Sequence, residues 1–478
     1  MRNRLLSIPV TALLWFRRDL RLSDHPALAA ALRDHEHVVP VFCLDDRLLT
    51  GRHASGPRTQ FLLECLQDLD TNLQKRGAHL VVRHQRPEQA LPELTRETNA
   101  DAVYFTRDIT PFARTRGHEV HAALTAAGIT EHALPGLTVA DDVTTIRTKS
   151  KSGAPYSVFS PFYKRWLDLP RRKVIPPPTT IPTPQVLDHT PIPTLNSLGL
   201  HQELTTPQPG GESKAAARLA WFLNGPINHY ADLHDTPGTD GTSKLSAYLH
   251  FGCISPRTIE AALPSNPSAE AFHRQLCWRD FYHHVQFHHP ETAHTEFQER
   301  YRGTLTWTQD EGDRLLTAWQ QGQTGYPLVD AAMRQLLREG WMHNRARLLT
   351  GSFLTKHLGI DWRQGEAWFM RLLLDGDQAN NNGNWQWIAS VGVDPQPVFR
   401  RLYNPTLHLK RYDPEGTYVR KYVPELRKVP TPYLPEPWTM PTPLQHASNC
   451  HIGKDYPAPI IDLPTARNQA LSRYATAT

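Results

Sequence analysis

The sequence predicts an amino-terminal α/β domain, a doubly wound parallel sheet of Rossmann-like type, joined to a larger all-helical domain. Three observations support this order. Short apolar runs alternate with helical stretches over the first 135 residues, ten prolines lie between Pro170 and Pro209, and helical patterns dominate after Glu212. Strands separated by helices form parallel sheets, and prolines interrupt regular core elements. We therefore expect an α/β domain at 1–135, a proline-rich interdomain linker at 136–211 and a helical domain at 212–478.

The amino-terminal elements follow from the spacing of apolar residues. Uninterrupted apolar runs predict buried strands at Ala12–Phe16, Val38–Leu44, Leu80–Val82 and Ala102–Phe105. Between them, helical spacing predicts helices at Pro26–Arg33, Arg58–Arg76, Pro87–Thr98 and Thr115–Ala127. Neither G-x-G-x-x-G nor G-x-x-x-x-G-K-[ST] follows the first strand, so the usual phosphate-binding loops are absent from this sequence.

The second half shows helical spacing with little strand alternation. Helices are predicted at Ala215–Asn224, Arg257–Leu263, Ala269–His289, Asp313–Gln320, Pro327–Glu339 and His343–His357. The triple proline Pro176–Pro178 and the pair Gly210–Gly211 fit a semi-rigid connection before this half.

Bulk properties narrow the class of protein. Five scattered cysteines without a close pair favour a reducing, intracellular protein and argue against a structural zinc site. No apolar run reaches the roughly 18 residues that a membrane-spanning helix needs. The net charge of +5 is mild, but eight Lys or Arg residues lie between Val398 and Lys428. Such a run suits a polyanion such as nucleic acid, although an ordinary solvated surface carries similar charges.

Two stretches of the helical half carry polar groups that a core does not need. "GTSKLSAYLHFGCISPR", residues 241–257, offers hydroxyls and a lysine at a helix start, which suits a phosphate seat or a simple helix cap. In "FHRQLCWRDFYHH", residues 272–284, helical spacing places an amide, an indole, a guanidinium and a phenol on one face, those of Gln275, Trp278, Arg279 and Tyr282. That face suits a flat aromatic ligand with polar edges and phosphates.

Two further stretches concern charge and aromatic residues. Arg347 shares a helical face with Asn344, and an inward-facing arginine needs an anionic partner. Asp375 and Asp377 are candidates for that partner. They open "DGDQANNNGNWQWIAS", residues 375–390, in which two tryptophans stand two residues apart. On a helix, such residues point about 200° apart, so these indoles are expected in different surroundings.

The motifs together resemble the DNA photolyase and cryptochrome family. "LLWFRRDLRLSDHPAL" is similar to the start of its antenna domain, and "TSKLS", "QLCWRDFY", "QTGYPLVDAAMRQL", "GWMHNRARLLTGSFL", "IDWRQGEAWFM" and "DGDQANNNGNWQW" are similar to its flavin domain. The similarity covers nearly the whole chain in the same order. Class I cyclobutane pyrimidine dimer photolyases are the most similar members.

The resemblance implies a U-shaped FAD inside the helical domain, fully reduced in the active enzyme. Arg347 would pair with Asp375 beside the isoalloxazine ring, Asp377 would contact the ribityl or adenine side, and Asn381 would face flavin N5. The residues implied to hold the cofactor are Tyr230, Thr242, Ser243, Lys244, Leu245, Ser246, Gln275, Arg279, Asn344, Arg347, Asp375, Asp377 and Asn381. No metal is expected.

The resemblance also implies an activity, the light-driven splitting of cyclobutane pyrimidine dimers in DNA, a carbon–carbon lyase reaction of a monomeric enzyme. Trp385, Trp362 and Trp307 would carry electrons from the surface to the flavin. A flipped-out dimer would lie between Trp278 and Trp387, with Asn344 at a pyrimidine edge and Arg345 at a flanking phosphate. The residues implied to contact DNA are Trp278, Gln275, Asn344, Arg345, Leu348, Trp387, Arg400 and Arg401, with Lys410 as a further candidate.

Two positions depart from the pattern of the family's repair enzymes. Gln275 stands where these enzymes usually carry glutamate, and Leu348 where they carry methionine. A cryptochrome-like blue-light photoreceptor, a (6-4)-type photolyase and a DNA-binding flavoprotein without photochemistry therefore remain as alternatives. A second chromophore, if present, is expected to be a deazaflavin or flavin rather than folate, because Pro111 and Phe112 replace the Asn-Glu pair used for folate.

Overall fold

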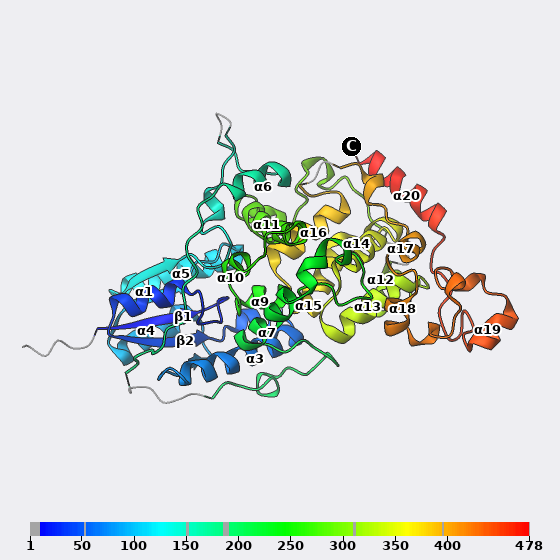
Figure 1. Ribbon diagram of the computed structural model, residues 1–478. Helices are drawn as coiled ribbons and strands as arrows, with labels where there is room; N and C mark the ends of the chain where they lie inside the picture. Colours follow the sequence, from blue (N-terminus) through cyan, green and yellow to red (C-terminus); the bar gives the residue numbers. More distant parts are fainter. Residues whose placement is uncertain are drawn as a thin grey trace, which may run out of the picture.

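The computed structural model describes residues 10–51, 54–149, 153–184, 191–308, 312–393 and 396–477. An α/β part and a larger helical part lie side by side (Figure 1). This arrangement confirms the predicted fold class.

The α/β part is built on a five-stranded parallel sheet in the order β3-β2-β1-β4-β5. Its strands are β1 (Thr11–Phe16), β2 (His37–Cys43), β3 (Val81–Arg83), β4 (Ala100–Thr106) and β5 (Thr130–Leu134). The four predicted strands are confirmed to within about two residues at each end. β5, which the apolar pattern did not predict, is a partly exposed edge strand.

Helices cover both faces of the sheet, so side chains of β1 enter two separate cores. Leu13 and Trp15 pack with the core under α4 (Pro87–Thr98) and α5 (Pro111–Ala126). Leu14 and Phe16 join the core that includes α1 (Pro26–Asp34) and α3 (Gly56–Gln74). The short helix α2 (Asp46–Leu49) follows β2. Since both faces are buried, the strands are apolar runs rather than alternating ones.

The described part of the segment predicted as linker contains the helix α6 (Phe159–Leu167) and makes contacts with both parts of the protein. α6 packs on α11 (Pro267–His288) above the sheet (Figure 1). The proline-rich stretch is held by the α/β part: Arg76 Nε donates to Pro178 O at 2.8 Å, and Val38 N donates to Pro182 O at 2.8 Å.

The helical part confirms the predicted helices, and its longest helix is α11. The others are α7 (Glu212–Leu223), α8 (Tyr230–Leu233), α9 (Ser246–Phe251), α10 (Pro256–Ala261), α12 (Gly312–Gln321), α13 (Pro327–Glu339), α14 (Asn344–Ser352), α15 (Trp362–Leu372), α16 (Gln378–Ala389), α17 (Pro405–Tyr412), α18 (Thr417–Tyr422), α19 (Thr442–Ser448) and α20 (Leu463–Thr476). A π-helical turn, Phe353–His357, continues α14. Within the described ranges, no helix combines the length and the apolar character that crossing a membrane requires.

The end of β1 joins the two parts. Arg18 forms an ion pair with Asp377 at the start of α16, and its Nη1 lies 3.6 Å from Asp108 Oδ2 of the α/β part. Leu20 N donates to Phe251 O at 3.1 Å, and Arg21 Nη1 donates to Gly252 O at 2.9 Å. The chain that follows β1 therefore contacts the end of α9 directly.

Candidate functional site

The predicted pair of Arg347 and Asp375 is present at the centre of the helical part. Arg347 Nη2 donates to Asp375 Oδ2 at 2.8 Å, and Arg347 Nε donates to Met342 O at 2.8 Å. Asp375 Oδ1 is buried and accepts no hydrogen bond from any described residue. A buried carboxylate oxygen without a donor is costly, so this oxygen is placed for a ligand that donates a hydrogen bond.

Asp377 caps α16 and is held by the other half of the chain. Its Oδ1 accepts from Asn380 N at 2.9 Å, and Oδ2 pairs with Arg18. Burial alone would raise the pKa of Asp377, but the charge of Arg18, with His250 and His283 beside it, holds that pKa well below its usual value. Sequence reasoning did not find Arg18 as its partner. The predicted contact of Asp377 with the cofactor stays a prediction.

Asn381 lies on α16 with its amide held in one orientation. Its Nδ2 donates to Glu366 O and Glu366 Oε1, both at 3.1 Å. The amide oxygen is thereby left as the group that can face a ligand. Glu366 is a further residue that the motif match did not assign, and it lies on α15, which packs against α16.

The hydroxyl-rich loop before α9 is shaped by an arginine of α7. Arg218 donates from Nε to Ser243 O and from Nη2 to Thr242 O, both at 2.8 Å. Lys244 adopts a left-handed backbone conformation with φ of 50°, and its Nζ lies 3.0 Å from Asp240 Oδ1. α9 has no side-chain cap, so N–H groups at its start remain for an anion.

Other residues assigned to this side of the site are placed as follows. Leu245 is buried, Ser246 begins α9, and Tyr230 begins α8 and is buried. Burial raises the pKa of Tyr230, so its hydroxyl stays protonated and can donate. Tyr230 also stacks on His234 with ring centroids 5.2 Å apart.

The predicted face of α11 includes one residue that ties the helix to another segment and two residues at or near the protein surface. Arg279 Nη1 donates to Leu137 O at 2.7 Å, so this side chain ties α11 to the segment after β5. Gln275 is exposed and Trp278 is half-buried. One face of the Trp278 indole stacks on Phe159 of α6, with centroids 3.7 Å apart and planes within 1°. The backing ring, Phe159, was hidden from sequence reasoning inside the predicted linker.

The three tryptophans of the predicted electron path differ in burial. Trp385 and Trp362 are 3% and 1% exposed, whereas Trp307 is half-buried. Trp385 also contacts two rings that the motif match did not assign, Phe369 at 4.9 Å and Trp319 at 6.2 Å between centroids.

Trp387 lies in surroundings quite different from those of Trp385. Its indole is half-buried beneath the guanidinium of Arg401, whose central carbon lies 4.0 Å from the ring centroid. Arg401 itself is only 2% exposed and donates from Nη1 to Trp387 O at 2.9 Å. The guanidinium of Arg401 therefore supports the indole, and its predicted contact with DNA stays a prediction. Nearby Phe399 is 60% exposed, a feature that sequence reasoning missed.

Some of the polar residues that are predicted to contact DNA near these indoles already have partners within the protein. Arg345 is paired with Asp235, with Nη2 2.5 Å from Oδ2, and its guanidinium lies over Tyr412. Asn344 and Arg400 are exposed, Leu348 is half-buried, and Lys410 Nζ lies 3.9 Å from Glu436 Oε2. An anion arriving at Arg345 would therefore share it with an existing partner.

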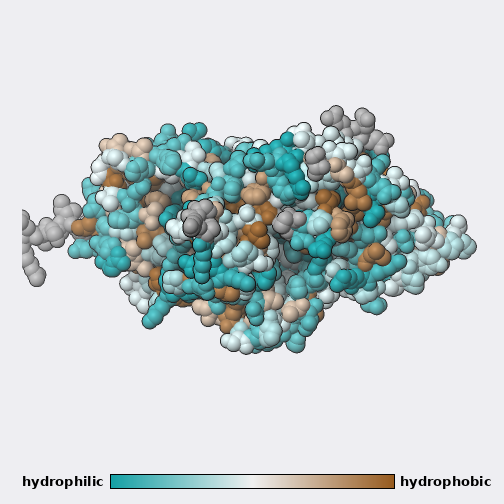
Figure 2. Space-filling view, turned by 90° about the horizontal axis from the view of Figure 1, so that it is seen from above, coloured by the Kyte–Doolittle hydropathy of each residue, from teal (hydrophilic) through white to brown (hydrophobic). Residues whose placement is uncertain are grey.

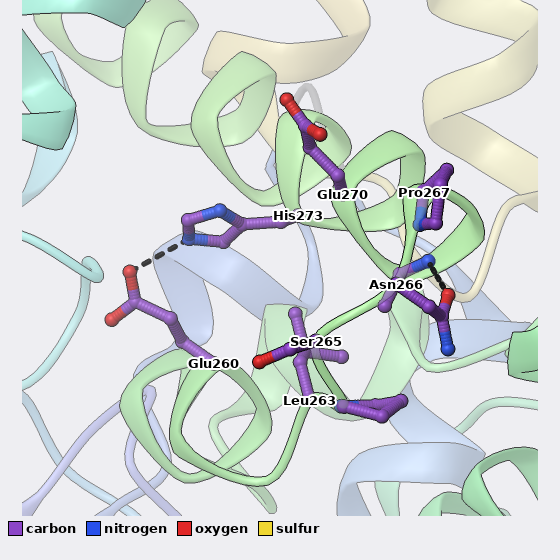
Figure 3. Close-up of a pocket in the computed structure, with 9 residues that line it drawn as sticks. Glu260, Leu263, Ser265, Asn266, Pro267, Glu270 and His273 are labelled. Carbon is purple, nitrogen blue, oxygen red and sulfur yellow. Dashed lines mark hydrogen bonds and ion pairs between the residues drawn. The ribbon is translucent and has the colours of Figure 1, made fainter.

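A surface hollow lies elsewhere in the helical part. It has a volume of about 460 Å³ and lies where α10 leads into α11, around Glu260 and His273 (Figure 3). None of the predicted cofactor or DNA residues lines it. Glu260 is engaged there by Arg171 and His273 at 3.1 and 2.7 Å, so its charge is already neutralised. Residue chemistry therefore locates the site better than cavity size.

The outer surface has mixed polarity. Figure 2 shows a face that is mostly hydrophilic, with hydrophobic residues in small scattered groups. Such groups are usual on a globular surface.

Comparisons with known proteins identify the family of this chain. A family model described as DNA photolyase matches residues 12–185, and one described as the FAD binding domain of DNA photolyase matches residues 272–476. A deoxyribodipyrimidine photo-lyase of Streptomyces griseus is 40% identical, over 95% of this chain and 97% of that protein. One of Synechococcus sp. is 39% identical, over 97% of this chain and 96% of that protein.

Solved structures are similar over the same length. A bacterial class III photolyase from Agrobacterium tumefaciens is 34% identical with a TM-score of 0.90, covering 99% of both chains. A cryptochrome of Synechocystis sp. is 30% identical with a TM-score of 0.88, covering 100% of both chains. Matches across both parts of the chain, with an FAD-binding domain among them, establish that this protein belongs to the DNA photolyase family.

Proposed function

We propose that this protein splits cyclobutane pyrimidine dimers in DNA under blue light, as a monomer that uses FAD. One observation above all supports dimer binding. Trp278 of α11 and Trp387 of α16 lie on two helices that pack together, and each indole has one face backed, by Phe159 and by Arg401. The opposite faces of the two indoles would stack on flat partners. A base that stacks on such an indole gains about 1–3 kcal/mol.

The residues present fit a flavin. Asp375 Oδ1 awaits a donor, Arg347 supplies a positive charge next to it, and the amide of Asn381 is fixed by Glu366. A neutral amide suits a ring that changes redox state, because it neither adds a charge nor releases a proton. When bound, FAD supplies the light-driven transfer of one electron to the dimer and takes the electron back after splitting.

The protein's own residues select and hold the substrate. A dimer stacks poorly in the duplex, so moving it out of the helix costs less than moving a normal base. Trp278 and Trp387 would receive it, and Asn344 would hydrogen-bond a pyrimidine edge. Gln275 can donate or accept at a thymine edge, but it cannot supply a carboxylic proton. We also assign Phe399, a highly exposed ring two residues before Arg401, to contact with the DNA around the flipped dimer.

We further propose that the chain divides as residues 1–135, 136–211 and 212–478, with α6 of the middle segment serving the dimer site through Phe159. Trp385, Trp362 and Trp307 would form the electron path, and Thr242, Ser243 and Lys244 would lie on the phosphate side of the cofactor.

The absorption spectrum of the purified protein tests the cofactors. A flavin spectrum is expected, and any further near-ultraviolet or violet band would identify a second chromophore.

The decisive experiment measures repair directly. Protein carrying chemically reduced FAD is mixed with an oligonucleotide that contains one cyclobutane dimer and is illuminated with blue light. Loss of the dimer is expected in light and not in darkness. An intact dimer, with the flavin demonstrably bound and reduced, would refute the proposal.

A photoreceptor is the second candidate, favoured by Gln275, Leu348 and the likeness to the Synechocystis cryptochrome. It predicts equal, weak binding to damaged and intact DNA. Preference for damaged DNA would exclude it. A (6-4)-type photolyase is the third candidate, and an oligonucleotide with a (6-4) photoproduct, tested in parallel, distinguishes it. That photoproduct is expected to stay intact, because Asn344 stands where (6-4) photolyases are implied to carry a histidine.

A further inference from the structure

We propose that Glu296 tunes Trp362 for electron transfer, an inference that rests on the proposed path through Trp385, Trp362 and Trp307. The indole Nε1 of Trp362 donates to Glu296 Oε1 at 3.2 Å. Both side chains are buried, with 1% of Trp362 and 4% of Glu296 exposed. Of the three tryptophans in the path, Trp362 is the one whose indole nitrogen meets a carboxylate among the described residues.

The carboxylate of Glu296 also pairs with Arg363, whose positive charge opposes the oxidation of Trp362. Arg363 Nη2 lies 2.8 Å from the same Glu296 oxygen, and Arg363 Nη1 lies 3.1 Å from Asp361 Oδ2. The central carbon of this guanidinium is also 4.8 Å from the centroid of the Trp362 ring. The indole thus lies beside one carboxylate and one guanidinium, and that guanidinium is paired with a second carboxylate, so the group carries a net negative charge when all three are ionised.

The backbone fixes this arrangement. Arg302 Nε donates to the carbonyl oxygen of Glu296 at 2.7 Å, which fixes the backbone of the segment after α11, and Arg363 Nε of α15 donates to His294 O of that segment at 2.9 Å. Trp362 begins α15, whose N-cap is Asp361, so Asp361, Trp362 and Arg363 are consecutive and rigidly oriented. The contact is therefore built from two rigid segments.

Oxidation of a buried indole explains why such a partner matters. Trp385 would supply one electron to the bound cofactor and take one from Trp362 in turn, and the positive charge would then reside on Trp362. A carboxylate within hydrogen-bonding distance stabilises that charge more strongly than a neutral acceptor does. The indole N–H of the oxidised ring is acidic, and its proton can move to Glu296 Oε1. It returns when Trp362 takes an electron from Trp307, which an external thiol reductant refills at the surface.

Opposite effects are expected from the two partners of Trp362. Glu296→Gln replaces a charged acceptor by a neutral one of the same shape, so electron transfer from Trp362 to Trp385 slows by about tenfold. Arg363→Gln removes the competing cation from both the carboxylate and the ring face, so the same step becomes faster. Glu299→Gln is the matched control: its carboxylate belongs to the same segment, is 86% exposed and pairs with Arg302.

Two measurements on the full-length protein with bound flavin test the inference. In protein labelled with ¹⁵N-tryptophan and kept dark, the indole N–H signal that Trp362→Phe removes should shift in Glu296→Gln and not in Glu299→Gln. Transient absorption after a light pulse then gives the rates of electron transfer along the path. An unmoved indole signal, or rates that change in the same direction in Glu296→Gln and Arg363→Gln, would overturn the inference. Dimer splitting by the unmodified, chemically reduced protein is followed separately, because it tests the proposed function independently of the path.

Discussion

Trp385 and Trp387 stand two residues apart on α16 and lie in different surroundings. Trp385 is buried against Phe369 and Trp319, and Trp387 is half-buried beneath Arg401. A helix turns about 100° per residue, so one element can present one indole to the core and the other to the surface. Substitutions at the two positions should therefore separate two properties of the protein.

Trp387→Ala should weaken binding to dimer-containing DNA by about 1–3 kcal/mol, the usual value for one stacked base, and leave flavin photoreduction in place. Trp385→Phe should slow photoreduction and leave DNA affinity in place. Fluorescence anisotropy and absorption spectroscopy measure the two properties. Trp221→Ala, which removes an exposed indole of α7, is the control. Loss of both properties in either variant would contradict the separation.

The ion pair of Arg347 and Asp375 predicts a loss of cofactor. Asp375→Asn leaves the Arg347 charge without its partner and changes the oxygen that faces the ligand, so FAD affinity should fall by about 1–3 kcal/mol. The ratio of flavin to protein absorbance after dialysis measures this. Arg371→Lys, at an exposed pair with Glu203, should keep its flavin. Equal flavin content in both variants would remove Asp375 from the site.

At the scale of elements, glycines allow the helices of the site to pack closely. A Cβ added at Gly365 of α15 would lie 2.2 Å from Trp385 Cη2, and one at Gly383 of α16 would lie 2.1 Å from Tyr282 Cδ1. Such distances cannot be accommodated without movement, so these glycines set the spacing of α15 and α11 from α16.

Gly365→Ala should lower the free energy of unfolding by about 1–3 kcal/mol through overpacking, and it should displace Trp385. Gly117→Ala is the control, because Gly117 lies within α5 and an added Cβ would meet nothing within 4 Å. That variant should gain up to about 1 kcal/mol from helix propensity. Urea denaturation measures both, and equal stabilities would show that α15 can move away from α16 at little cost.

The same elements show how far sequence reasoning reached. Periodicity predicted four of the five strands and the main helices, because their burial imposes an apolar pattern. It did not predict β5, whose residues are partly exposed, or α6, which lies among prolines. Motif similarity indicated Arg347, Asp375 and the tryptophans. Sequence reasoning missed four residues because each acts through a contact with a residue distant in sequence: Phe159, Arg218, Arg18 and Glu296. Arg18 and Asp377, for example, are separated by 359 positions.

For the whole molecule, buried histidines predict a pH dependence of stability. Burial lowers the pKa of His250, His283, His284, His343 and His357 to about 4. An unfolded histidine binds its proton near pH 6.5, so between pH 6.5 and 4 the unfolded state binds more protons than the folded state. The free energy of unfolding should therefore be highest above pH 6.5 and fall as the pH is lowered towards 4.

Asp280 has the opposite effect on the free energy of unfolding. Burial raises its pKa to about 6, so the cost of burying its charged form disappears as the pH falls. Burial also raises the pKa of Glu212, Asp330 and Asp413, and the five histidines should outweigh these four carboxyl groups. Urea denaturation at several pH values measures the slope, which His284→Gln should reduce. His84→Gln, at a half-exposed ring, should leave it unchanged. A stability that is constant from pH 7 to 4.5 would contradict the prediction.

The contact of Arg18 with Asp377 constrains how the two halves of the chain can change during evolution. The segment after β1 supplies a charge to α16, and hydrogen bonds to the end of α9, from within the first 25 residues of the chain. A recombination event that exchanged the amino-terminal half between two relatives would replace this arginine together with the sheet. Unless the incoming half also carried a cation there, the cap of α16 would keep a buried carboxylate beside two neutral histidines. The two halves can therefore diverge in sequence, but at this position they are constrained to evolve as a pair.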